Sequence, residues 1–257
     1  MNKKLKKYIL KCTLEFLVIV LGISISFALN KSQNDSKNEE KENIALINLM
    51  LDLEEQLAAL DHYIIEETEF YNDGIYISKS YKVNKSFILN DSIIYKLNNL
   101  SIRRTFNPIN TTFKELVSTG NIDLLRNKKL KRNITKLYNE LDRVSLVTLN
   151  NNTNLIDRLY NPILVKNIPY VFRFNGKKTA ITHFKPFIRM QNKVFDLESL
   201  NKIYKTSQSN IDNPENTLNL FNVLQFRIQL ASGQKETYIR LSQKISELIN
   251  EISLYTS

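Results

Sequence analysis

The stretch ALINLMLDLEEQLAALDHYII, residues 45–65, decides the fold of this chain. Large apolar residues recur in it at alternating steps of four and three: Leu46, Met50, Leu53, Leu57, Leu60 and Ile64. No glycine or proline occurs between Gly22 and Gly74. This spacing is typical of one face of a long amphipathic helix. We expect that face to pack inside a helical bundle of the same chain, and a coiled-coil dimer seam is the alternative.

The composition favours helices throughout the 257 residues, because it includes only 5 glycines and 5 prolines. We therefore predict a mainly α fold, in which an N-terminal transmembrane helix is followed by an extracytoplasmic bundle of long helices with one small β-hairpin. The extracytoplasmic domain is predicted over residues 31–257. Its first long helix, over residues 31–82, rises from the membrane, and Asp73-Gly74 is a candidate end or bend.

The segment LEFLVIVLGISISFALN, residues 14–30, is the most apolar part of the sequence. From Ile9 to Leu29 a helix would be roughly 30 Å long, which matches the hydrocarbon core of a bilayer. We predict a transmembrane helix over residues 13–30, after a basic tail of residues 1–12. A cleaved export signal is the competing interpretation, because Ser26-Phe27-Ala28 has the small-x-small form that signal peptidases accept.

Basic residues indicate the orientation of this helix. Five lysines precede the apolar run, whereas the residues directly after it carry charges of both signs. The positive-inside rule then keeps the N-terminus in the cytoplasm and sends the bulk of the chain across a bacterial cytoplasmic (inner) membrane into the periplasm. The same lysines supply half of the net charge of +10. No basic stripe interleaved with aromatic residues remains, so we do not expect nucleic-acid binding.

Glu15 is an unusual residue for a membrane span, and two interpretations are open. In the first, it lies near the cytoplasmic headgroups and pairs with Lys11 along the helix. In the second, Glu15, Gly22 and Ser26 share a helix face on which small residues let a second transmembrane helix approach closely. That packing face would serve self-association or contact with another envelope protein. The first interpretation is favoured.

Residues 111–160 predict a helix, a tight turn and a second, longer helix. Thr112 and Glu115 have the spacing of a capping box at the start of the short helix. Gly120 suits the left-handed backbone position that closes it. Asn127 is the expected N-cap of the longer helix, which should end where Asn161-Pro162 interrupts it.

Two further elements are expected towards the C-terminus. In YVFRFNGKKTAIT, residues 170–182, Asn175-Gly176 separates two β-favouring runs and predicts a hairpin. Asn213-Pro214-Glu215 then has the order of cap, proline and acid that begins a helix, predicted over residues 214–254. Its apolar positions repeat at steps of three and four: Tyr238, Leu241, Ile245, Leu248 and Ile252.

No catalytic constellation is visible in the sequence. The two histidines, His62 and His183, lie far apart and have no neighbours with metal-ligand spacing, and the only cysteine is Cys12. Nucleotide-binding and nucleophile-elbow glycine motifs are also missing. We therefore expect a protein that is not an enzyme and that holds no cofactor and no metal.

Two groups of residues resemble a large uncharacterised bacterial family of short, single-pass membrane proteins. The first lies in and after the span: Glu15, Gly22, Ala28 and Asn30. The second surrounds the turn: Thr112, Glu115, Leu116, Ser118, Gly120, Asn121, Leu125, Asn127, Leu130 and Tyr138. The resemblance covers roughly residues 8–160. The chain departs from it in lacking a tryptophan near residues 32–34. The resemblance implies a membrane-anchored helical domain and transfers no catalytic residue.

The functional hypothesis from the sequence is a non-enzymatic interaction or scaffold module of the cell envelope, which presents helix faces to another envelope protein or to itself. The alternative is a ligand-sensing periplasmic bundle that acts with a partner protein. It is less favoured because the cytoplasmic tail is short and no transmitter segment is recognisable before Ser257. A pocket between helices with convergent polar groups would favour it.

Overall fold

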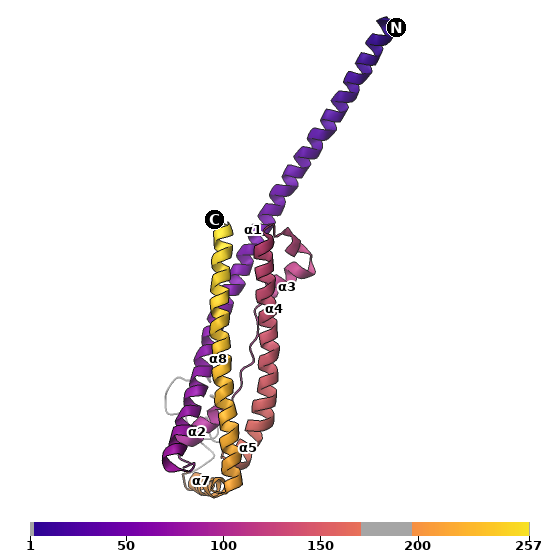
Figure 1. The fold of residues 1–257 in the computed structure, drawn as a ribbon. Helices are drawn as coiled ribbons and strands as arrows, with labels where there is room; N and C mark the ends of the chain where they lie inside the picture. Colours follow the sequence, from indigo (N-terminus) through magenta and orange to yellow (C-terminus); the bar gives the residue numbers. More distant parts are fainter. Residues whose placement is uncertain (1–2, 171–196, 257) are drawn as a thin grey trace.

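The computed structural model describes residues 3–170 and 197–256, and within them the side chains of residues 15–170, 198–199 and 201–256. This part of the chain is mainly helical, as the sequence predicts, and holds no strand within the described ranges (Figure 1). The elements are α1 (Lys3–Asn84), α2 (Asp91–Asn99), α3 (Thr111–Ser118), η1 (Asn121–Leu124), α4 (Lys128–Asn151), η2 (Asn152–Tyr160), α5 (Asn161–Asn167), α7 (Leu197–Ile211) and α8 (Pro214–Thr256). The predicted hairpin of residues 170–182 lies almost wholly outside the described residues.

Helix α1 is unbroken over 82 residues and contains both the apolar segment and the amphipathic repeat. It continues through Asp73-Gly74, where the sequence suggested an end or a bend. Gly74 has a packing role instead: a Cβ at this position would lie 2.3 Å from Cγ1 of Ile228. The glycine therefore lets α8 approach α1 closely, at a site where any side chain would collide with its neighbour.

The bundle consists of three long helical runs: α1, α8, and α4 continued by η2 and α5 (Figure 1). Leu46, Leu53 and Leu60 of the repeat are fully buried in a first core cluster, and the other three apolar residues of the repeat pack against that cluster partly buried. The apolar positions of α4 and of the second half of α8 complete it. The repeat thus packs within one chain.

A second core cluster lies further along the bundle, at the end away from the N-terminus. It joins Phe70 and Ile77 of α1 to α2, α5 and the first half of α8. The short helix α2 contributes Ile93, Ile94 and Leu97, all buried. The sequence analysis identified neither α2 nor α7, because both are short and lie between polar segments.

The helical run that begins with α4 does not stop at Asn161-Pro162. It widens into the π-helical segment η2, and α5 then carries Pro162 in its first turn. A proline lacks the N–H of a regular helix and its ring crowds the preceding turn. A wider turn directly before it is one way in which a helix accommodates this.

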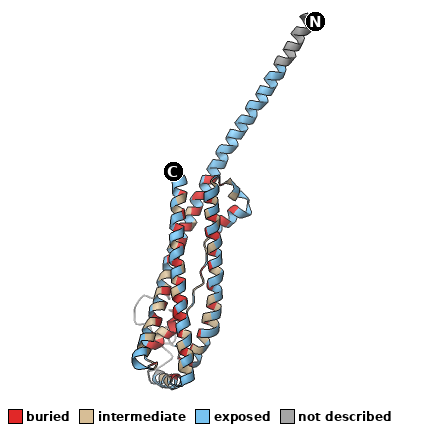
Figure 2. Cartoon of the chain, in the orientation of Figure 1, coloured by how far each residue is buried: buried red, intermediate tan, exposed pale blue. Residues whose placement is uncertain are grey.

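The N-terminal part of α1 extends beyond the bundle, and its residues 15–41 are exposed on every side of the helix (Figure 2). A stretch of it with a mean hydropathy of 1.5 is long and apolar enough to cross a membrane, and none of that stretch is buried inside the chain. A helix that was part of a soluble core would have one face covered.

Candidate functional site

The connection between α2 and α3, residues 101–110, runs extended along the bundle between α8 and α4 (Figure 1). This connection belongs to no helix or strand, so its backbone groups need other hydrogen-bond partners. Polar side chains of α1 supply some of them. The Tyr63 hydroxyl donates to the carbonyl of Thr105 at 3.2 Å, and Oε1 of Gln56 accepts from the N–H of Ile109 at 2.7 Å. The face of α1 that points into the bundle therefore carries polar groups, those of Gln56 and Tyr63, among its apolar side chains.

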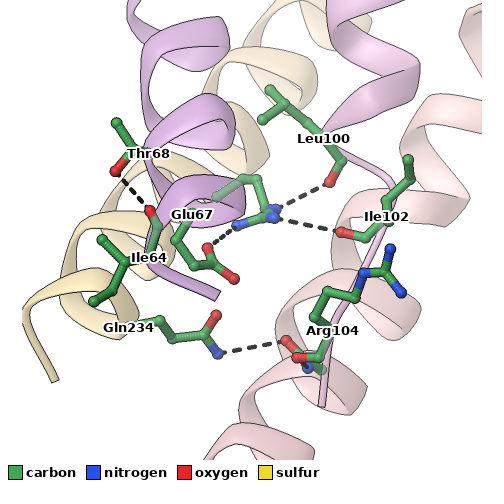
Figure 3. Close-up of polar contacts among 9 residues, drawn as sticks. Ile64, Glu67, Thr68, Leu100, Ile102, Arg104 and Gln234 are labelled. Carbon is green, nitrogen blue, oxygen red and sulfur yellow. Dashed lines mark hydrogen bonds and ion pairs between the residues drawn. The ribbon is translucent and has the colours of Figure 1, made fainter. Parts of the chain in front are cut away.

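Arg227 of α8 also bonds to this connection, and it is only 2% exposed. Its Nε donates to the carbonyl of Leu100 at 3.0 Å, and a terminal nitrogen donates to that of Ile102 at 3.3 Å. The other terminal nitrogen lies 3.5 Å from the Glu67 carboxylate (Figure 3). The guanidinium carbon lies 4.4 Å from the centre of the Phe70 ring, which adds a cation–π contact.

Burial changes the titration of both charged partners. Desolvation raises the pKa of Glu67 to about 7, against the attraction of Arg227, which lowers it. Desolvation also lowers the pKa of Arg227, and the nearby Glu67 opposes this. Because a buried charge is tolerated only with a partner, each residue depends on the other to remain inside the bundle.

Four more polar residues extend this cluster towards η2. Gln234 donates to Oδ1 of Asn152 at 3.5 Å, and Asn152 donates to the carbonyl of Arg104 at 2.7 Å. The guanidinium of Arg104 lies 3.0 Å from Glu66. We call Glu66, Glu67, Arg104, Asn152, Arg227 and Gln234 the polar layer. Glu66, Glu67 and Gln234 fall between the residues of the first and second core clusters along α1 and α8, and Arg227 lies among those of the second cluster.

An open groove of about 370 Å³ lies between α4 and α8, beside the polar layer. Thr148, Gln234 and Tyr238 are its buried lining residues of polar character. The Oε1 atom of Gln234 has no hydrogen-bond partner in the described part of the chain. The remaining lining residues are Arg143, Val144, Val147, Asn151, Leu155, Phe226, Gln229, Leu230, Gly233, Thr237 and Arg240.

Arg227 is engaged by one carboxylate and two carbonyls of the same chain, so its contacts join α8 to α1 and to the connection between α2 and α3. No group of three or more histidine, cysteine or acidic side chains that could hold a metal ion occurs among the described residues. His183 lies outside them.

The three residues proposed for membrane-helix packing lie on the exposed part of α1. The Ser26 hydroxyl donates to the carbonyl of Gly22 at 2.9 Å, within the helix itself. A Cβ at Gly22 would meet no atom within 4 Å, so this face is open to an approaching helix. Glu15 lies on the same part of α1, and its side chain is exposed.

The turn residues occupy partly different positions from those expected. The N-cap of α3 is Asn110, so Thr112 and Glu115 lie inside the helix and do not form a capping box. The N–H of Thr112 donates instead to Asp52 of α1 at 3.0 Å. Gly120 has a left-handed backbone, with φ of 73°. Asn127 caps α4 by accepting from the N–H groups of Lys129 and Leu130.

Sequence reasoning did not identify the polar layer or the groove. The spacing along α1 does signal one member of the layer: Glu67 falls on the same face as Leu46, Leu53 and Leu60, as does the buried Gln56 outside the layer. Polar residues at core positions of an amphipathic helix indicate buried hydrogen bonds. Their partners come from distant segments, so the sequence alone does not identify them.

Comparison with protein-family models, with curated proteins and with solved structures finds no match. The family resemblance drawn from the sequence therefore stays a prediction.

Proposed function

We propose that this chain is a single-pass protein of the bacterial cytoplasmic membrane, in which the apolar part of α1 is retained in lipid. The exposure of that part on all sides supports this, because such a surface is stable in hydrocarbon and costly in water. The lysines of the N-terminal tail favour a cytoplasmic N-terminus and a periplasmic bundle. The proposal agrees with the family resemblance drawn from the sequence.

We further propose that the bundle is a non-enzymatic interaction module. The single observation that carries this is an apolar stripe on the outer face of α1, at the end of the bundle nearest the N-terminal segment. Ile44, Ile47 and Leu51 are 52%, 48% and 58% exposed, and Ile65 continues the stripe. Their spacing puts them on one side of the helix, opposite the buried repeat. An unpartnered apolar face of this kind is typical of a protein contact surface.

The charges around the stripe indicate the chemistry of the partner. Glu54, Glu55 and Asp61 border it, and all three are exposed. A second copy packed in parallel would bring these acids against one another, which is unfavourable. We therefore propose another envelope protein that offers a helix with apolar residues and basic flanks.

A ligand-sensing bundle that acts with a partner protein is the second candidate. The observation that favours it is the groove of about 370 Å³ between α4 and α8, whose lining includes both apolar and polar side chains. The two candidates are compatible, because the stripe lies on α1 and the groove residues belong to α4, η2 and α8.

Photocrosslinking in intact cells tests the interaction surface. A photoreactive amino acid at position Leu51 should yield an adduct with a different protein, whereas the same group at Glu236 on α8 should not. Replacing Glu54 and Glu55 together with lysine should abolish the adduct. An adduct only between copies of the chain, or none at position 51, would contradict the proposed partner.

Protease added to spheroplasts tests the location separately. The bundle should be digested from outside, while the N-terminal tail stays protected. Full protection of the bundle would contradict the orientation. A mature protein that begins directly after Ala28 would contradict the retained anchor.

A further inference from the structure

Positive charge gathers at the end of the bundle from which the N-terminal part of α1 emerges. The sequence RNKKLKR, residues 126–132, begins directly before α4 and continues through its first turn. Arg126 pairs with Glu39 and Glu42, which places this segment beside the point where α1 enters the bundle (Figure 1). Helix α4 runs from there towards η2, so its first turn lies at the same end of the bundle as the apolar part of α1.

Three of the five cations in this segment have no acidic partner. Arg126 and Lys131 are paired with acids of α1 and η1. Lys128, Lys129 and Arg132 are exposed and form no ion pair within the described part of the chain. Steps of three and four residues put them on one side of α4. We call these three residues the basic face, and its charge is free to attract an anion outside the chain.

The basic face does not serve the stability of its own helix. No acidic residue occurs in the first turn of α4. Positive side chains near a helix N-terminus are repelled by the helix dipole, which favours acids there. The charges are therefore locally unfavourable, and local conflicts of this kind are expected where a surface has a function.

The distance from the proposed membrane boundary to this end of the bundle is short. From Asn30, where the predicted span ends, to Glu42, the first buried residue of α1, a helix rises by about 18 Å. Lipid headgroups fill about 5–8 Å of this length. The rest is comparable with the Debye length of about 8 Å at physiological ionic strength. The side chains of α4 also lean towards its N-terminus, which narrows the gap.

We propose that the basic face binds the anionic headgroups of the membrane in which α1 is anchored, and so holds this end of the bundle against the lipid surface. This inference rests on the proposed membrane location and adds an electrostatic contact to it. Clustered lysine and arginine side chains close to a membrane are attracted to anionic lipid. Because α1 already tethers the bundle, docking is an intramolecular step, and a few charges are sufficient.

Energy transfer from the bundle to labelled lipid headgroups measures this contact in the full chain, held in nanodiscs. The donor is attached at Asn121→Cys in a Cys12→Ser background, which has no other cysteine. Asn121 is exposed and lies in η1, which Asp123 joins to Lys131 of α4. One set of nanodiscs contains phosphatidylcholine alone, and the other contains an equal mixture of phosphatidylcholine and phosphatidylglycerol.

We expect more energy transfer in the mixture than in phosphatidylcholine. The difference should vanish at about 1 M salt, where the Debye length is about 3 Å. Each cation near a lipid surface changes the ratio of docked to undocked bundle about fivefold. The triple variant Lys128→Gln, Lys129→Gln and Arg132→Gln should therefore lower that ratio about a hundredfold in the mixture. Its melting temperature should not fall, because the lost charges oppose the dipole of α4.

A second triple variant is the matched control. Lys79→Gln, Lys82→Gln and Lys202→Gln remove the same charge from exposed sites in the last turns of α1 and in α7, at the far end of the bundle (Figure 1). This variant should show the same energy transfer as the unmodified chain in both kinds of nanodisc.

Elution of the chain with the nanodiscs is read separately, and it distinguishes the two ways in which the inference can fail. A chain that does not elute with nanodiscs of either composition would overturn the proposed membrane location and this inference together. A chain that does elute with them, but gives equal energy transfer in both compositions, would overturn this inference alone. That result is expected if the basic face binds an acidic protein instead. Equal losses in the two triple variants would also overturn it.

Discussion

The hydroxyl of Tyr255 donates to the carboxylate of Glu42 at 3.0 Å, which joins the last turn of α8 to the point where α1 enters the bundle. Glu42 is almost fully buried, and it also accepts from the backbone N–H and from Nε of Arg126, at 2.8 and 2.6 Å. One carboxylate thus ties α1 to the segment before α4 and to the end of the chain.

Tyr255→Phe should loosen the last turns of α8, because it removes one hydrogen bond to a charged acceptor. We expect a loss of about 1 kcal/mol, confined to this end of the bundle. Hydrogen exchange measures it: amides near Ile252 should exchange faster, whereas those near Leu224 should not. Faster exchange along the whole of α8 would mean that the contact supports the global fold instead.

Arg227→Met should be strongly destabilising, since it leaves Glu67 buried without its partner and two carbonyls without a donor. Removing one member of a buried pair costs about 3–5 kcal/mol. The double variant Glu67→Leu with Arg227→Met should recover much of this loss, because no uncompensated charge remains. Thermal melting of the two single variants and the double variant gives the coupling. Additive losses would show that the pair is not energetically linked.

The stability of the bundle should depend on pH through Glu67. Burial raises the pKa of Glu67 from the ordinary 4.5 to about 7, so the folded chain keeps a proton that the unfolded chain releases. The free energy of unfolding contributed by this group therefore falls as the pH rises from about 4.5 to about 7.

The variant Glu67→Gln isolates this effect, since Glu66 also has a raised pKa from burial and titrates in both proteins. The melting temperature of the unmodified chain should decline towards pH 7 relative to that of Glu67→Gln. Parallel pH profiles for the two proteins would exclude Glu67 as the titrating group.

Gly74→Ala should destabilise the bundle by about 1–3 kcal/mol, because the new methyl group collides with Ile228. Gly233→Ala is the matched control: it lies in α8 with no atom within 4 Å of a Cβ, so alanine should stabilise the helix slightly. Chemical denaturation of both variants checks the contrast. A neutral effect of Gly74→Ala would show that α8 can move away without loss.

The sequence predicts the long helices well where apolar side chains alone determine the packing. Leu46, Leu53 and Leu60 on α1, and Leu241 and Ile245 on α8, have helical spacing and are all buried in the first core cluster. The sequence also predicts where a nearby side chain caps a helix, as Asn127 does at the start of α4.

The remaining features depend on contacts between distant segments. Gly74 looks like a helix breaker until Ile228 is known to lie against it. Thr112 has the spacing of a capping residue, but its N–H donates to Asp52 of α1. Asn110 occupies the N-cap position of α3 instead. The pairing of Glu67 with Arg227 joins residues 160 positions apart, and nothing in their local patterns indicates it.

The absence of any break in α1 between Lys3 and Asn84 has a mechanical consequence for an anchored bundle. From Asn30 to Asn84 the helix is about 80 Å long at about 1.5 Å per residue. A tilt of about 20° in the bilayer, common for spanning helices, would displace the far end sideways by roughly 28 Å. In the proposed membrane anchor, helix α1 would act as a lever, and a change in membrane thickness would alter how far from the membrane its distal end reaches.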